Sequence, residues 1–361
     1  MNARMKKYAN RNSNIEVLRI ISIFFIVLSH WAVHSKFQFS EGHLSLNQFM
    51  VEISSVGELG VCIFLLISGY YSVKQKQSIG GFLNLLFKIW GYNICILVIT
   101  QLGGVHQANL RDVLKYAVPI YNTHWFAYAF LILYILMPYI NRLAVNLEKK
   151  VYKVLLLTVF TGWSLIYTFT GADLEFSYLG WFVFVYLIGA YIRIYGINLT
   201  TKIVRWILVL SVIALILSCL FINLAGLKMG FYPEHGTHFY SLHSPIILLI
   251  AIAMFQLFRM KDHKTHVATN IIASTTFGIY LISDNPLLRD WIWNGMFNNG
   301  SLSNNNFLFL IGIGEALLVM ISCMIIDLIY GWLMNNKFAN NVKSLFERQI
   351  EKGISMIDKQ E

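Results

Sequence analysis

Two ionisable residues in the first apolar stretch, Arg19 and His30, are the side chains best suited by position to carry out chemistry. Ionisable groups inside a stretch long enough to cross a membrane are costly, and they commonly mark functional sites. The spacing of these two residues corresponds to about 16 Å of helical rise and leaves them roughly 20° apart around the helix axis. One helix face would therefore carry a cation near one membrane surface and an imidazole beyond the middle of the bilayer.

Other ionisable residues in or beside apolar stretches extend the set of candidates, namely Glu58, Lys88, His124, Asp284, Glu315 and Asp327. Arg19 and His30 each also have a purely structural interpretation. In that interpretation Arg19 pairs with Glu16 three residues earlier, and His30 only hydrogen-bonds a neighbouring residue. The shared face of Arg19 and His30 favours a functional role, because exposing both side chains to lipid would be unfavourable.

The composition indicates the kind of protein that positions these residues. The chain has 361 residues, of which 57% are hydrophobic and only 13% charged, and its mean hydropathy is +0.60. Soluble domains contain about a quarter charged residues. A cytosolic enzyme, a nucleic-acid-binding protein and a disordered chain are therefore all disfavoured, and we predict an all-α, polytopic membrane protein.

Apolar stretches predict about ten transmembrane helices, since one crossing takes about 20 residues. They are expected at 15–34, 53–71, 82–102, 124–141, 151–170, 177–194, 203–225, 240–260, 270–290 and 307–334. This predicts a membrane domain over 15–334, with a cytoplasmic N-terminal segment at 1–14 and a cytoplasmic tail at 335–361.

The positions of the basic residues predict the orientation of the protein in the membrane. With ten crossings, 23 of the 28 Lys and Arg residues lie on one side of the membrane, and the other side has Lys36, Arg111, Lys115, Lys228 and Arg289. Basic residues concentrate on the cytoplasmic side of membrane proteins. Both termini are therefore expected in the cytoplasm, and the protein in the cell membrane.

The cysteines and the outer histidines give no metal-binding pattern. All four cysteines lie in apolar stretches without CxxC spacing and are expected to be small core residues. The outer histidines lack an HExxH pattern, and the spacing of His235 and His238 alone is a weak signal. We therefore predict that the protein binds no metal.

The segment 336–361 has the pattern of an amphipathic helix. Its apolar residues recur at helical spacing among Lys and Glu, at Val342, Leu345, Phe346, Ile350, Ile354 and Ile357. Such a helix either lies on the inner leaflet or packs against the cytoplasmic loops.

Several motifs together resemble those of the integral-membrane acyltransferase family 3. The first is the pair Arg19-x10-His30. The others are Gly60–Tyr70 with its Ser-Gly-Tyr ending, Trp125-Phe126 leading to Pro138, Tyr186-Leu-Ile-Gly189-Ala-Tyr191, and Ser274–Pro286. The resemblance covers residues from about 14 to 334. It is closest to a branch from Gram-positive bacteria that acts on surface or secreted polysaccharides.

The resemblance implies a reaction and roles for individual residues. It implies transfer of an acyl group, expected to be acetyl, from acyl-CoA to a hydroxyl of a cell-surface, secreted or lipid-linked polysaccharide. Acyl-CoA is a co-substrate, and no bound cofactor is expected. His30 would act as a general base or as a transient acyl carrier. Arg19 and Lys88 would bind the phosphates of the donor.

Five further residues are candidates for acceptor binding or support of the site, namely Glu58, Trp125, Tyr280, Asp284 and Glu315. Trp125 has an alternative role in the aromatic belt at the membrane interface. Glu315 has an alternative role in hydrogen bonding between helices. Membrane lipid and other polysaccharide-assembly proteins are further expected partners, whereas nucleic acid is not.

Two positions depart from the family pattern. Leu85 stands where many members have the first Arg of an Arg-x-x-Arg pair, and Ser283 stands where members often have His. A transporter or flippase for a glycan or lipid-linked intermediate remains an alternative, although the chain shows no paired halves of the kind common in transporters. A catalytically silent partner in polysaccharide assembly is a third.

Overall fold

The computed structural model describes residues 11–40, 42–118, 124–172, 174–230, 235–334 and 344–352, which form α-helices and short connections. Eight helical segments are long and apolar enough to cross a membrane, and two shorter apolar segments accompany them. This confirms the prediction of an all-α polytopic membrane protein with about ten apolar helices.

The eight long segments begin and end close to the predicted positions. They are α2 (Ser13–His34), α3 and α4 (Leu46–Ile53 and Gly57–Ser72), α5 (Ile79–Leu102), α7 (Trp125–Asn146), α8 with η1 and α9 (Lys149–Phe160, Thr161–Ile166 and Tyr167–Thr170), α10 (Tyr178–Tyr195), α11 (Thr201–Met229) and α15 (Leu308–Leu333). The two shorter segments are α12 (Pro245–Arg259) and α13 with α14 (Val267–Ala273 and Thr276–Ser283).

Two features differ from the sequence-based expectation. The helix predicted over 270–290 ends with α14 at Ser283, because Pro286 disfavours helical backbone at the residue before it. A helix that was not predicted, α6 (Leu110–Ala117), begins at a capping box between Asn109 and Asp112. Three single-turn elements, η2 (His238–Tyr240), η3 (Trp291–Met296) and η4 (Asn299–Leu302), lie in loops.

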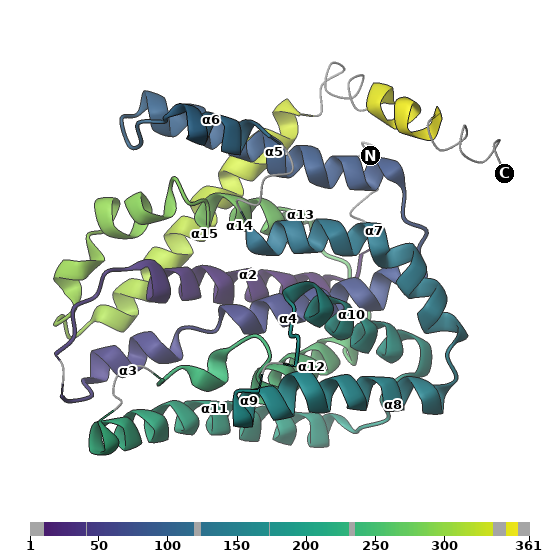
Figure 1. The fold of residues 1–361 in the computed structure, drawn as a ribbon, viewed down its shortest axis with the longest axis horizontal. Coiled ribbons are helices and arrows are strands. Elements are labelled where there is room, and N and C mark those ends of the chain that lie inside the picture. Colours follow the sequence, from purple (N-terminus) through teal and green to yellow (C-terminus); the bar gives the residue numbers. More distant parts are fainter. Residues whose placement is uncertain are drawn as a thin grey trace.

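Helix α2 lies in the middle of the bundle. Figure 1 shows it between α4, α10 and α12 on one side and α5, α14 and α15 on the other. Its beginning is fixed because the Ser13 hydroxyl donates to Asn270 Oδ1 on α13 at 2.8 Å and the Ser13 amide donates to the Lys264 carbonyl. Leu18, Val27 and Trp31 are fully buried. A helix held at its start and packed along its length gives Arg19 and His30 fixed positions.

Helices α4 and α10 approach each other closely through two glycines. A Cβ atom at Gly69 would collide with the Tyr186 carbonyl oxygen, and one at Gly189 would collide with the Leu66 carbonyl oxygen. Small residues allow this backbone contact between membrane helices. The motifs around Ser68-Gly69-Tyr70 and Tyr186–Tyr191 therefore have a packing role that brings α4 against α10.

Large apolar side chains on α11 face outward. Trp206, Leu210 and Phe221 are 58%, 59% and 72% exposed in the isolated chain. In a membrane this surface would contact lipid. Helix 344–352 of the predicted tail lies beside α5, where Phe346 packs against Phe87 with ring centroids 5.5 Å apart. The tail residues Val342, Ile354 and Ile357 lie outside the described residues.

Candidate active site

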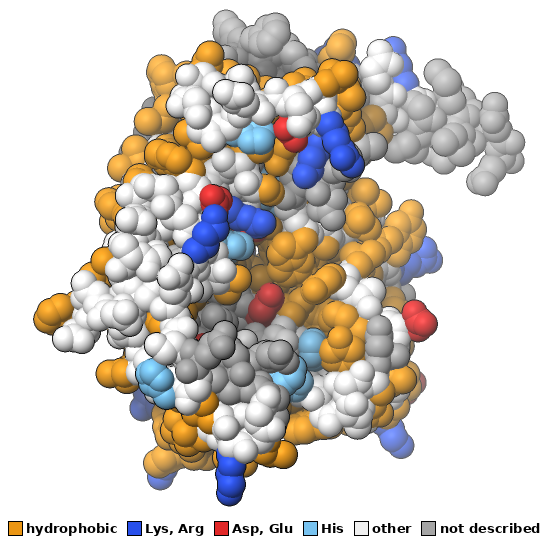
Figure 2. All heavy atoms as spheres, turned by 60° about the vertical axis from the view of Figure 1, so that its left-hand side comes forward, with side chains coloured by type: hydrophobic (Ala, Val, Ile, Leu, Met, Phe, Trp, Pro, Cys, Tyr) orange, Lys and Arg blue, Asp and Glu red, His pale blue; other side chains and the backbone are white. Residues whose placement is uncertain are grey.

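The first of two neighbouring cavities surrounds His30. It has a volume of about 210 Å³, and its walls come from α2, α4, the start of α7 and the end of α14. His30, Glu58, Trp125, Tyr280 and Asp284 all line it. Figure 2 shows histidine, basic and acidic side chains around a hollow on the face at the left of Figure 1. Five residues from distant parts of the sequence, each a candidate, thus meet in one cavity.

His30 contacts two residues at the end of α14. Its Nδ1 lies 3.3 Å from the Ser283 hydroxyl, and its Nε2 lies 3.8 Å from Asp284 Oδ1. When Nδ1 carries the proton and donates to Ser283, Nε2 keeps its lone pair and lies beside the Asp284 carboxylate. The imidazole is 13% exposed, so it is sheltered yet accessible. This arrangement provides a base with a carboxylate beside it.

Asp284 is the centre of a cluster of charged and titratable groups. Its Oδ1 lies 3.4 Å from His34 Nε2 and 3.3 Å from Arg289 Nη1, in addition to the contact with His30. Its side chain is only 8% exposed. Nearby at the surface, Lys36 Nζ lies 2.7 Å from Asp290 Oδ1, and this hydrogen bond lowers the pKa of Asp290. The acidic groups on this face are therefore held next to basic partners.

Glu58 and Trp125 also line this cavity. Within the described part of the chain, Glu58 Oε2 is buried without a hydrogen-bond partner. The Trp125 ring packs against Tyr178 and Phe182 with centroids 5.1 and 5.9 Å away. A carboxylate with free acceptor capacity and an indole ring are groups that suit a hydroxyl-rich ligand.

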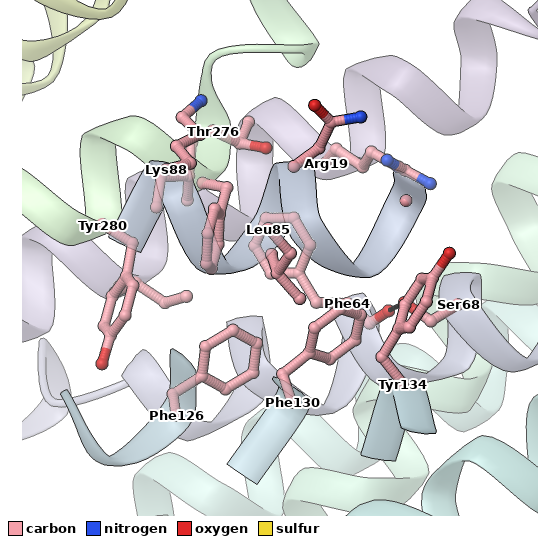
Figure 3. Close-up of a pocket in the computed structure, with 15 residues that line it drawn as sticks. Arg19, Phe64, Ser68, Leu85, Lys88, Phe126, Phe130, Tyr134, Thr276 and Tyr280 are labelled. Carbon is pink, nitrogen blue, oxygen red and sulfur yellow. Dashed lines mark hydrogen bonds between the residues drawn. The ribbon is translucent and has the colours of Figure 1, made fainter. Parts of the chain in front are cut away.

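The second cavity lies on the other side of Tyr280 and has a volume of about 370 Å³. Figure 3 shows Phe126 and Phe130 facing Leu85 across it, with Arg19 and Lys88 along one edge. Leu85 thus contributes to an apolar wall of this cavity. This cavity combines an apolar interior with basic groups along one edge.

The basic groups continue into an adjoining cavity of about 320 Å³ that Arg11, Arg19, Lys88 and Asp327 line. Lys88 Nζ lies 2.7 Å from Asp327 Oδ1, and the Tyr92 hydroxyl donates to the same oxygen at 2.7 Å. Arg19 Nε lies 3.8 Å from Glu16. The pairing of Arg19 with Glu16 is therefore present, and Arg19 nevertheless lines two cavities.

Ile26 and Tyr280 line both the first and the second cavity. The Tyr280 ring packs against Phe126, His124 and His30, with centroids 5.4, 5.8 and 6.4 Å away. Arg19, Ile26 and His30 thus line the cavities from the same helix, and Ile26 and Tyr280 lie between the cavity of Arg19 and the cavity of His30.

Two candidates lie outside this arrangement. His124 Nε2 is 3.1 Å from the Leu281 carbonyl oxygen, which can only accept, so His124 acts as a donor that ties the start of α7 to α14. Glu315 on α15 is 9% exposed and does not line the His30 cavity; its neighbours are Trp31 and Asn299. Its place favours the structural interpretation.

Three residues of the site were not selected from the sequence as candidates: His34, Arg289 and the hydroxyl of Ser283. His34 follows His30 by four residues, which places both on nearly the same helix face, and that signal was present in the sequence. Ser283 reaches His30 only through the fold, across 253 positions of sequence, and a local pattern does not reveal that contact. Arg289 follows Asp284 by five residues, so the contact between these two side chains is local.

A protein-family model described as an acyltransferase domain, of the acyltransferase 3 family, matches residues 12–336. The match covers nearly the whole chain, and the chain belongs to this family. It is therefore an acyltransferase and a multi-pass membrane protein. No curated protein and no solved structure matches the chain.

Proposed function

We propose that this acyltransferase moves an acetyl group from acetyl-CoA, bound at the cytoplasmic end of α2, to a hydroxyl of a polysaccharide at the outer end. The acceptor is a cell-surface, secreted or lipid-linked polysaccharide, as in the Gram-positive branch that the motifs resemble. The enzyme works in the cell membrane with acetyl-CoA as co-substrate.

The observation that carries the proposal is the pair of cavities along α2. Arg19 and Lys88 lie at one end and His30 at the other, with Ile26 and Tyr280 between them. Acyl-CoA carries phosphates at one end and a reactive thioester at the end of a slender chain. Its phosphates would lie near Arg19 and Lys88, and its thioester would lie near His30. The apolar walls at Phe64, Phe126 and Phe130 suit the slender part.

The basic end suits the phosphates of the donor. Arg11, Arg19 and Lys88 line one cavity there, and guanidinium groups form strong, charge-assisted hydrogen bonds to phosphate. Lys88 already contacts Asp327, which fixes the position of its ammonium group and offsets part of its charge. Arg19, whose partner Glu16 is farther away at 3.8 Å, is therefore expected to contribute more to donor affinity.

His30 acts as a general base in the proposed reaction. Nε2 takes the proton of the acceptor hydroxyl as its oxygen forms a bond to the thioester carbonyl carbon. The tetrahedral intermediate then breaks its carbon–sulfur bond, and the imidazolium returns the proton to the leaving thiolate. The Asp284 carboxylate, 3.8 Å from Nε2, stabilises the imidazolium in between.

The acceptor would bind in the outer cavity. Glu58 offers a carboxylate oxygen to a sugar hydroxyl, and Trp125 offers an aromatic face. A cavity of about 210 Å³ accommodates only part of a sugar chain, so the rest of the acceptor would extend outside. Other polysaccharide-assembly proteins are expected to present that chain.

The test is transfer of radiolabel from acetyl-CoA to polysaccharide in membranes that contain the protein. We expect His30→Asn to abolish transfer. The exposed loop residue His263 provides a matched control, because it lines none of the three cavities and His263→Asn should leave transfer unchanged. Normal labelling by His30→Asn at equal protein amount would refute the assignment of the base.

A further inference from the structure

Two histidines and one carboxylate converge at the outer cavity in an arrangement typical of a metal site. One ligand atom from each of His30, His34 and Asp284 lies within 4.8 Å of the other two. No other such group occurs in the described part of the chain. We propose that, in contrast to the metal-free protein predicted from the sequence, these three residues form a Zn²⁺ site, and that Zn²⁺ bound there inhibits the enzyme.

The distances suit a tetrahedral ion after small side-chain movements. Ligand atoms about 2.0–2.1 Å from zinc are separated from each other by roughly 3.3 Å. Asp284 Oδ1 lies 3.4 Å from His34 Nε2 and 3.8 Å from His30 Nε2. Two histidines four residues apart on one helix are also a common zinc-binding pair.

The surroundings favour the metal-binding form of His30. Ser283 lies 3.3 Å from His30 Nδ1, and a partner on that nitrogen orients the ring and leaves Nε2 for an ion. Hydrogen-bond partners of this kind strengthen metal sites in general. Ser283 is fully buried, so its position does not depend on the solvent.

The charged groups around the site favour the binding of a cation. Glu58 and Asp284 line the cavity as carboxylates, against one guanidinium, Arg289. Arg289 competes for Asp284 at 3.3 Å, but its side chain is 39% exposed and can turn outward. The cavity volume of about 210 Å³ also leaves space for water in the fourth position.

Inhibition follows from the shared atom, and this step rests on the proposed function. Nε2 of His30 has one lone pair, which either accepts the proton of the acceptor or binds the ion. An occupied site therefore removes the base and places the ion in the acceptor cavity.

Binding is tested without any activity measurement. The full chain is purified through a tag without histidines and titrated with Co²⁺, whose visible absorption reports tetrahedral coordination, and Zn²⁺ is measured by equilibrium dialysis. We expect one Zn²⁺ per chain in wild type and in the control His263→Asn, and loss of that site in His34→Asn.

Two neighbours of the site should change its affinity for Zn²⁺. Ser283→Ala should weaken Zn²⁺ binding about tenfold or more, and Arg289→Gln should tighten it. Equal Zn²⁺ binding by wild type and His34→Asn, or none by wild type, would overturn the site.

Inhibition is tested separately on acetyl transfer. We expect Zn²⁺ to inhibit wild type reversibly, with recovery on chelation, and to inhibit His34→Asn much less relative to the metal-free rate of that variant. Zinc bound at the site without inhibition would refute the inhibitory role and leave the site standing. Metal binding in a protein that transfers no acetyl group would refute the proposed function alone.

Discussion

Replacement of Asp284 by asparagine tests whether its charge assists His30. The substitution keeps the size of the side chain and removes a negative charge 3.8 Å from His30 Nε2. Two unit charges about 4 Å apart attract by roughly 4 kcal/mol at an effective dielectric constant of about 20, which is an upper limit here. Arg289, 3.3 Å from the same oxygen, cancels part of this attraction. We therefore expect a loss of about 2 kcal/mol in stabilisation of the imidazolium, or roughly a thirtyfold lower kcat.

The assay is acetyl transfer at saturating acceptor with the concentration of acetyl-CoA varied, so that kcat and KM for acetyl-CoA are obtained separately. KM for acetyl-CoA should stay unchanged, because the basic groups lie in the other cavity. Asp290→Asn is the matched control, since Asp290 forms an exposed ion pair with Lys36 that contributes little. A kcat for Asp284→Asn within twofold of wild type would refute the reasoning.

Three further predictions concern the donor end, the histidine ring and the helix packing. Arg19→Gln should raise KM for acetyl-CoA about tenfold or more with a small change in kcat, since a charge-assisted hydrogen bond contributes roughly 1.5–3 kcal/mol; an unchanged KM would remove Arg19 from donor binding. Ser283→Ala should lower kcat about twofold to tenfold by releasing the His30 ring, and steady-state kinetics with unchanged kcat would contradict this. Gly189→Ala should destabilise the fold by about 1–3 kcal/mol, since its Cβ would meet the Leu66 carbonyl; an unchanged thermal unfolding midpoint in detergent would count against the α4–α10 contact.

Much of the fold could be predicted because a membrane imposes a simple length requirement on apolar helices. Helix α2 was predicted at 15–34 and spans Ser13–His34. Boundaries were less accurate where a local break interrupts an apolar stretch, as between α3 and α4, or where Pro286 ends the ninth helix early. Helix α6 was missed because it is short, amphipathic and exposed, and therefore has no apolar stretch to mark it.

The site could be predicted in part for the same reason. Ionisable residues are rare in apolar stretches, so Arg19, His30 and Asp284 stood out. Their contacts could not be predicted, because Asp284 meets His30 across 254 positions of sequence through the packing of α14 on α2. Glu315 stood out equally in the sequence, yet it lies away from the cavity. Burial alone therefore does not distinguish a site residue from one that joins two helices.

The central claim is that the donor enters at the Arg19 end and the acetyl group is delivered at the His30 end. The most direct measurement adds labelled acetyl-CoA, which does not cross membranes, to sealed vesicles of known orientation from cells that make the protein. We predict that inside-out vesicles label polysaccharide in their lumen, protected from added glycosidase until the vesicles are lysed, and that right-side-out vesicles incorporate no label until they are made permeable. Equal labelling of intact vesicles in both orientations, or label only on the side to which acetyl-CoA was added, would contradict the account.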